Sequence, residues 1–256
     1  MSDRSDTRRP EGLAGLPPRV LLATQPKAGT YLLSAVVAEL GFHQTYFHIA
    51  RRRMQAYDRT MLEAGAASPR NFDVEIPLRQ SLKLIRHGEF AASHLTPRRE
   101  VLRLVGHDFA VIACVRELRS SLISYARFAA STGRKGEATA RKIREEGAAP
   151  FIRKFGKRLI DRAQSIAAWG QQENAILLQF EDLKTDPQKG AGRIADFLGV
   201  TDRDPAEVLE TARSGQSLTK SDSFVSLEWT EAEEAAFRHI GGPEANAALG
   251  YPAQGR

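Results

Sequence analysis

Short apolar runs alternate with longer segments of helical periodicity along most of the chain. The apolar runs have the length of buried strands, and the four that we predict are residues 19–24, 43–48, 109–115 and 175–180. The helices that we predict between and after them are residues 30–41, 98–105, 118–130, 151–172, 187–198, 204–213 and 230–238. Strands that alternate with helices predict an α/β fold, here a single domain with a central parallel sheet flanked by helices.

The loop at residues 25–30 joins the first predicted strand to the first predicted helix, and its sequence suits an anion. Gly29 permits a tight backbone, and the amides and dipole of a helix start favour negative charge there. Lys27 and the hydroxyl of Thr30 would complete the site. The pattern predicts a P-loop-like phosphate cradle. The alternative is a purely structural connection, because the familiar triphosphate loop places its lysine after two glycines rather than before one.

A second candidate segment is residues 109–128, where an apolar strand ends in an arginine and an amphipathic helix follows. Arg116 stands at the carboxyl end of that strand, which is the sheet edge where ligands bind in open α/β folds. Its planar fork of donors suits a phosphate, and Ser124 follows eight residues later on the helix. The alternative is that Arg116 pairs with Glu117 and that Ser124 is only a small helix residue.

In this order and at this spacing, the two segments resemble the cofactor loops of the sulfotransferase family, which uses 3′-phosphoadenosine 5′-phosphosulfate (PAPS). The sequence PKAGTYL, from Pro26, is similar to the 5′-phosphosulfate loop PKSGTT of that family, and Arg116 with Ser124 reproduces its 3′-phosphate segment. Residues 177–200 are similar to its YEDL segment and following helix, with Phe180 at the tyrosine position. The resemblance spans roughly residues 18–251. The cofactor-binding residues that it implies are Lys27, Ala28, Gly29, Thr30, Tyr31, Arg116 and Ser124.

The segment SHLTP at residues 93–97 resembles the THLP segment of the same family, whose histidine is the catalytic base. The resemblance therefore implies that His94 is the base, with Lys27 as the second catalytic residue. A histidine with an ordinary pKa is partly neutral at working pH and can accept a proton from a hydroxyl. His48 is the reserve candidate among the six histidines of the chain.

The activity that the resemblance implies is direct transfer of the sulfuryl group from PAPS to a hydroxyl or amine of a small metabolite or carbohydrate, without a metal. The two other classes of protein that we considered are a P-loop-type kinase or hydrolase and a nucleic-acid-binding module. The first would need a glycine before a Lys-Ser/Thr pair together with acidic metal ligands. The second lacks an aromatic RNA-binding motif and a helix-turn-helix signature, so we expect no nucleic-acid partner.

The sequence departs from the family pattern at two places. Leu32 stands where many members have the tryptophan that stacks on adenine, so we expect another aromatic, such as Phe224 or Trp229, to hold the base. The late basic loop that grips the 3′-phosphate is not recognisable, and Arg213 and Lys220 are the cations of that region.

Composition agrees with a soluble enzyme. The chain has 256 residues and a formal net charge of +6, which suits an anionic cofactor or acceptor. We expect no membrane span, a disordered leader at residues 1–17, one domain at residues 18–256 and a cytoplasmic location with the single Cys114 reduced. The basic stretch at residues 131–158 is predicted to be a mobile lid, with a solvated helix face as the alternative.

Overall fold

The computed structural model of the chain describes residues 16–57, 71–133, 135–214 and 229–252. Its contacts divide the chain into two compact units. The sheet unit comprises the described residues of Met1–Thr24, Gly29–Val115 and Ser165–Leu218. The helical unit comprises the described residues of Gln25–Ala28, Arg116–Gln164 and Thr219–Arg256. The predicted leader at residues 1–17 lies almost wholly outside the described residues.

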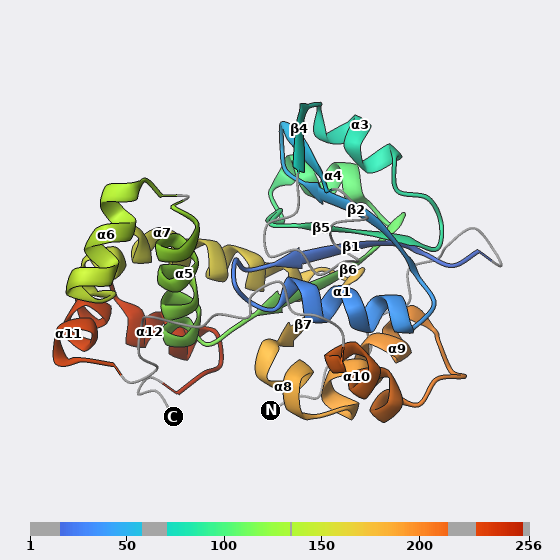
Figure 1. Cartoon of the computed structure of the whole chain (residues 1–256). Coiled ribbons are helices and arrows are strands. Elements are labelled where there is room, and N and C mark those ends of the chain that lie inside the picture. The colour runs from blue at the N-terminus through green and yellow to red at the C-terminus, as the bar shows by residue number, and fades with distance from the viewer. Residues whose placement is uncertain (1–15, 58–70, 134, 215–228, 253–256) are drawn as a thin grey trace. The chain divides into compact units, whose positions relative to one another are not determined.

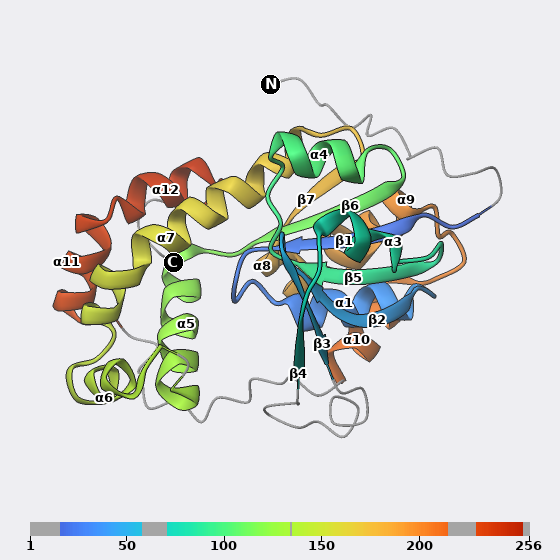
Figure 2. The same cartoon turned by 90° about the horizontal axis from the view of Figure 1, so that it is seen from above.

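The sheet unit is built on a seven-stranded sheet with the strand order β4-β3-β2-β5-β1-β6-β7 (Figure 1). Its strands are β1 (Arg19–Thr24), β2 (His43–Ile49), β3 (Arg53–Tyr57), β4 (Asn71–Glu75), β5 (Glu89–Ser93), β6 (Phe109–Val115) and β7 (Ala175–Gln179). In the part β2-β5-β1-β6-β7 of this order, every pair of neighbouring strands is parallel. The pairs β2-β3 and β3-β4 are antiparallel. Figure 2 shows β3 and β4 side by side at the end of the sheet next to β2.

The central strands β1 and β6 are mostly apolar because both of their faces are covered. β6 is buried at every residue, and β1 at all but its first. β1 is paired on both sides, with Ala23 opposite Ser93 of β5 and Thr24 opposite Cys114 of β6. The three strands therefore end in register, and the chain leaves all three at the same edge of the sheet.

Helices cover both faces of this sheet. They are α1 (Thr30–Glu39), α3 (Leu78–Lys83), α4 (Arg99–Val105), α8 (Phe180–Thr185), α9 (Arg193–Leu198) and α10 (Pro205–Ser214), with the shorter turns η1 (Ala168–Gln171) and η2 (Gln188–Gly192). In Figure 1, α1, α9 and α10 lie on one side of the sheet, and α3 and α4 lie on the other. α1 contacts β1, β2 and β5, whereas α3 contacts β2 and β3.

The helical unit contains α5 (Leu118–Thr132), α6 (Glu137–Glu146), most of α7 (Ala149–Ala167), α11 (Glu231–His239) and α12 (Gly242–Ala248). The start of α5 is fixed by Glu117, whose carboxylate accepts hydrogen bonds from the backbone amides of Arg119 and Ser120. The buried Asn246 of α12 accepts from the Leu118 amide and donates to Glu117. These bonds hold the residues that directly follow Arg116, which is a candidate ligand of phosphate.

The predicted fold class is confirmed, and the strands at 19–24 and 109–115 have the predicted bounds. The sequence analysis missed β3, β4 and β5 and the helices α3, α6, α8 and α12. β4 is exposed at all five residues, although its sequence NFDVE alternates polar and apolar residues. The predicted basic lid contains α6 and the start of α7. Among the described residues, no helix is long and apolar enough to cross a membrane.

Candidate active site

The loop between β1 and α1 has two residues in the left-handed backbone region. Lys27 has φ 69°, and Gly29, which precedes the first residue of α1, has φ 75°. The amide of Ala28 donates to the Gln25 carbonyl at 3.0 Å and closes the turn. Left-handed residues in such a turn direct successive backbone amides into a concave surface that suits an anion. This conformation costs a non-glycine residue roughly 1–2 kcal/mol, so the Lys27 backbone is strained.

Gly29 is also required by a close neighbour within the sheet unit, the ring of Phe180. A Cβ atom built on Gly29 would lie 2.2 Å from Cε2 of Phe180, far inside van der Waals contact. Phe180 begins α8 directly after β7, so the end of that strand presses against the start of α1. Any side chain at residue 29 would have to displace this ring.

A hydrogen-bond network in the sheet unit fixes the candidate base, His94. Its Nδ1 lies 2.6 Å from the backbone carbonyl oxygen of Thr24. A carbonyl oxygen can only accept, so Nδ1 carries a proton, and in the neutral form of the ring Nε2 is then the basic nitrogen. The Thr24 hydroxyl lies 3.4 Å from the same Nδ1 and 2.7 Å from the hydroxyl of Thr30. The neutral ring is thus held in the tautomer that a general base requires.

The segment that carries His94 is held on both sides by buried donors. The Ser93 hydroxyl donates to the Leu22 carbonyl at 3.1 Å, and the indole of Trp169 donates to the Leu95 carbonyl at 2.8 Å. Ser93 and Trp169 are both fully buried. The sequence analysis did not identify either residue, because each acts through the backbone of a neighbour.

The ring of His48 contacts the ring of His94 edge to face. The ring centroids are 4.5 Å apart and the ring planes are inclined by 64°. His48 comes from β2, two strands away from β1 in the sheet. The reserve candidate base therefore lies against the first candidate, which the sequence did not predict.

In the helical unit, one buried amide joins the two candidate cofactor segments. Gln25 is fully buried; its Oε1 accepts from the Arg116 amide at 2.9 Å and its Nε2 donates to the Ser121 hydroxyl at 2.8 Å. The guanidinium of Arg116 donates to the Lys27 carbonyl at 3.1 Å. Two segments separated by 89 residues in sequence are therefore in direct contact. The sequence analysis missed Gln25, although a polar residue directly after a buried strand is a signal that could have revealed it.

The Lys27 ammonium lies 4.6 Å from the centroid of the Phe128 ring. Burial, and secondarily the charge of Arg116, lowers the pKa of Lys27 to about 8. Ser124 lies partly buried on α5, one turn before Phe128. The structure therefore brings Lys27 and Arg116 together within the helical unit, where burial makes the Lys27 charge costly and an anion would stabilise it.

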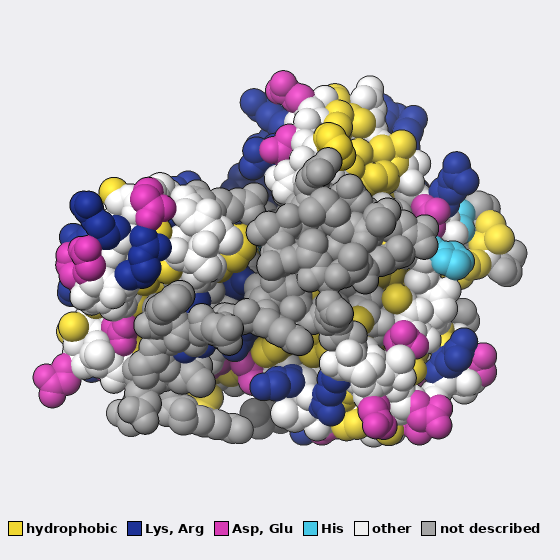
Figure 3. All heavy atoms as spheres, viewed as in Figure 1, with side chains coloured by type: hydrophobic (Ala, Val, Ile, Leu, Met, Phe, Trp, Pro, Cys, Tyr) yellow, Lys and Arg dark blue, Asp and Glu magenta, His cyan; other side chains and the backbone are white. Residues whose placement is uncertain are grey.

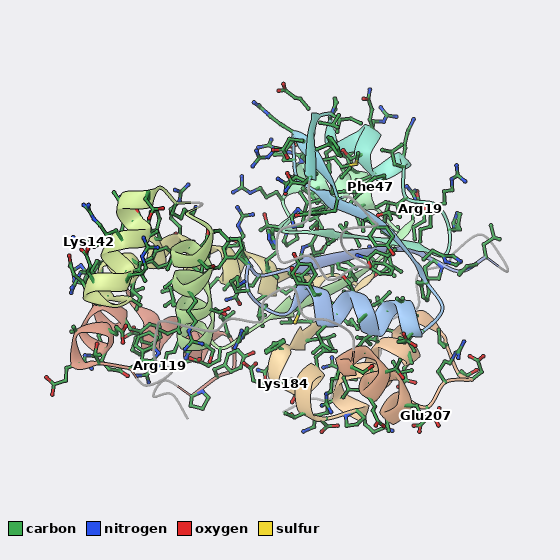
Figure 4. All side chains as sticks on the ribbon, in the orientation of Figure 1. Arg19, Phe47, Arg119, Lys142, Lys184 and Glu207 are labelled. Atoms are coloured by element: carbon green, nitrogen blue, oxygen red, sulfur yellow. The ribbon has the colours of Figure 1, made fainter. Side chains whose placement is uncertain are left out.

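The other predicted cofactor residues differ in exposure. Ala28 is buried, whereas Tyr31 is 44% exposed at the start of α1. Trp229 packs against Phe237 and lies beneath the Arg119 guanidinium, which is labelled in Figure 4. Arg213 is exposed in the last turn of α10. Phe224 and Lys220 lie outside the described residues, so the predictions made for them stay predictions.

Metal-binding groups are not found in the described part of the chain, where no cluster of three or more His, Cys, Asp or Glu residues could hold an ion.

This fold defines an α/β protein whose loop after β1 has the backbone geometry of an anion site. The chain belongs to the sulfotransferase family, since a model of the sulfotransferase domain matches residues 17–242. The family and the class of enzyme predicted from the sequence, a PAPS-dependent sulfotransferase, are confirmed.

Solved structures with the same fold include the mouse sulfotransferase SULT7A1 complexed with PAP, at 19% identity over 90% of this chain and 84% of that chain, with a TM-score of 0.58. Retinol dehydratase with androsterone and PAP matches at 14% identity over 95% of this chain and 80% of that one, with a TM-score of 0.48. A search of curated protein sequences found no match.

Replacing Gly29 with alanine tests the backbone requirement of the loop. We expect Gly29→Ala to lower the free energy of unfolding in urea by more than the roughly 1–2 kcal/mol of a left-handed alanine, because Phe180 must also move. Gly41→Ala is the matched control, since Gly41 also has positive φ but has open space around it. Equal losses in the two variants would show that the contact with Phe180 imposes no constraint.

Proposed function

We propose that Lys27, Gly29, Thr30, Arg116, Ser124 and His94 carry out sulfuryl transfer from PAPS to a hydroxyl or amine of a small acceptor. The observation that carries this assignment is the contact between the two cofactor segments, in which Arg116 donates to the Lys27 backbone. A nucleotide with phosphates at both the 5′ and 3′ positions needs two anion sites at a fixed separation. The neighbouring mouse structure holds PAP, the product that PAPS leaves after transfer, which supports the same nucleotide here.

The two phosphate positions have different proposed partners. Lys27, the amides at the start of α1 and the Thr30 hydroxyl bind the 5′-phosphate, where the bond to sulfur breaks. Arg116 and Ser124 bind the 3′-phosphate, which distinguishes PAPS from ATP. Gln25 touches neither phosphate in this scheme; it positions the backbones of both segments through its two hydrogen bonds.

The reaction is an in-line displacement at sulfur. The acceptor oxygen or nitrogen forms a bond to sulfur, the bond from sulfur to the 5′-phosphate oxygen breaks, and PAP leaves with that electron pair. The acceptor proton passes to Nε2 of His94, whose Nδ1 proton is already engaged by the Thr24 carbonyl. Negative charge grows on the leaving phosphate oxygen, where Lys27 and the loop amides stabilise it without reorganisation.

Nucleotide selectivity tests the proposed cofactor site. In calorimetric titrations at one salt concentration, we expect PAP to bind more tightly than ATP or 5′-AMP. Arg116→Ala should weaken PAP by about tenfold or more, because a charged hydrogen-bonding partner contributes about 1.5–3 kcal/mol. Arg103→Ala removes an equal charge from an exposed position on α4 and should leave the affinity nearly unchanged. A preference for ATP, or equal losses in both variants, would refute the assignment of Arg116.

The lowered pKa of Lys27 makes PAP binding depend on pH. Above pH 8 most Lys27 side chains are neutral in the ligand-free protein, and a bound phosphate raises their pKa again. PAP binding should therefore take up a proton at pH 8.5, and its affinity should fall as the pH rises from 8 to 10. Titrations in two buffers of different ionisation enthalpy measure this uptake. Lys27→Arg stays charged in this range and should take up none; equal heats in both buffers for the unmodified protein would contradict the lowered pKa.

His94→Asn separates proton transfer from nucleotide binding. The asparagine amide can still donate to the Thr24 carbonyl but cannot act as a base, so kcat should fall by about 10²- to 10⁴-fold while PAP affinity changes less than about twofold. His87→Asn is the control, because His87 Nδ1 also lies against a backbone carbonyl, that of Pro17. If His94→Asn kept more than a tenth of kcat, the base would have to be a different residue.

A further inference from the structure

The extension of the sheet formed by β2, β3 and β4 has one wholly polar face. His48 pairs directly with Gln55 of β3, and Gln55 pairs with Asp73 of β4. Residues directly opposite each other in antiparallel strands project from the same face. The three side chains therefore form one row across the three strands, beginning at the histidine that touches His94.

Neighbouring positions on the same face are polar as well. Arg53 pairs with Glu75, and Tyr57 pairs with Asn71. Two contacts confirm the shared face, since the Tyr57 hydroxyl lies 3.4 Å from Oε1 of Gln55 and Arg53 lies 3.9 Å from the Asp73 carboxylate. The side chains of Arg53 and Asp73 are 62% and 50% exposed, so this face is open to a ligand.

The opposite face of the same strands is apolar. Ile49 pairs with Met54, and Met54 with Val74; Ala56 likewise pairs with Phe72. α3 contacts β2 and β3, and Figure 3 shows hydrophobic side chains gathered over α3 and β4. Phe47, labelled in Figure 4, alternates with His48 and so belongs to this apolar set. On this apolar face Ile49 and Met54 are buried, whereas Phe72 and Val74 of β4 are exposed, and the polar face lies on the other side of the same strands.

An irregularity in β2 sets which residues share the face with His48. Between the pairs Gln44–Phe90 and His48–Ala92, β2 uses four residues where β5 uses two. Tyr46 within this bulge has φ 58°, a strained conformation for a tyrosine. The Thr45 hydroxyl holds the bulge by donating to the Phe90 carbonyl at 3.0 Å. Bulges of this kind redirect side chains near active sites, and a slip of one residue would turn every following side chain to the other face.

We propose that this polar face binds the acceptor, and that the acceptor is a neutral polyhydroxylated molecule such as a sugar or cyclitol. The inference rests on the proposed function. Strands lie about 4.8 Å apart, so the row from His48 to Asp73 spans roughly 10 Å, the length of one to two sugar rings. Its side chains offer both donors and acceptors to hydroxyl groups, and Arg53 offsets only one of the two carboxylates of the face, Asp73 and Glu75, which disfavours an anionic acceptor. An apolar alcohol would remove water from these groups without replacing its hydrogen bonds.

Matched acceptor pairs test the class of acceptor directly. The PAPS-loaded enzyme would be assayed with cyclohexanol beside myo-inositol and with 4-nitrophenol beside 4-nitrophenyl glucoside. Transfer to the polyhydroxylated member should be at least about tenfold more efficient in kcat/KM, as expected for a site that hydrogen-bonds its substrate. Preference for the cyclohexanol or the phenol, or no transfer to any of the four while PAP still binds, would overturn the inference.

Variants on the two faces of the same strands identify the surface. Gln55→Leu and Asp73→Leu should each raise the KM for the better polyhydroxylated acceptor by about fivefold, the loss of one net hydrogen bond, with kcat and PAP affinity unchanged. Phe72→Ala is the matched control on the opposite face of β4 and should leave KM unchanged. Equal KM values in all three variants would overturn the inference. If the unmodified protein did not bind PAP, the proposed function itself would be refuted. Failure of the acceptor inference and failure of the proposed function are therefore distinguishable.

Discussion

The pairing of β1 on both of its edges is the constraint on which the candidate site depends. Because β1 is in register with β5 and β6, Thr24 is the last paired residue before the candidate phosphate loop. Its carbonyl receives the Nδ1 proton of His94, and its hydroxyl lies 2.7 Å from that of Thr30. One strand end therefore fixes both the tautomer of the base and the start of α1. A shift of β1 by a single residue would remove all of these contacts at once.

Lys27 combines a strained backbone with an ammonium group whose charged form is disfavoured by burial. Lys27 has a left-handed backbone and a lowered pKa, and its ammonium lies over the face of the Phe128 ring. The buried Gln25 amide and the Arg116 guanidinium keep the backbone in this conformation. A cation that is already ordered and desolvated in the folded protein can stabilise a developing negative charge without further reorganisation.

The sequence predicted the parallel centre of the fold, because apolar runs carry strong local signals, and glycine and cations marked the two candidate cofactor segments, which remain predictions. It did not predict β3, β4 or β5, although the NFDVE of β4 alternates polar and apolar residues and so carries a signal that could have revealed a strand; the EFAAS of β5 is short and has no comparable pattern. It also missed Gln25, Trp169 and the contact of His48 with His94. Each of these depends on pairing between segments far apart in the chain, and the bulge of β2 that places His48 cannot be read from local spacing.

The central claim is that the loop after β1 and the segment after β6 bind the two phosphates of one nucleotide. A crystal structure of the protein with PAP tests it most directly. The account predicts the 5′-phosphate within about 3 Å of the Lys27 ammonium and the Thr30 hydroxyl, and the 3′-phosphate within the same distance of Arg116 and Ser124. PAP bound elsewhere, or with its 3′-phosphate away from Arg116, would contradict it.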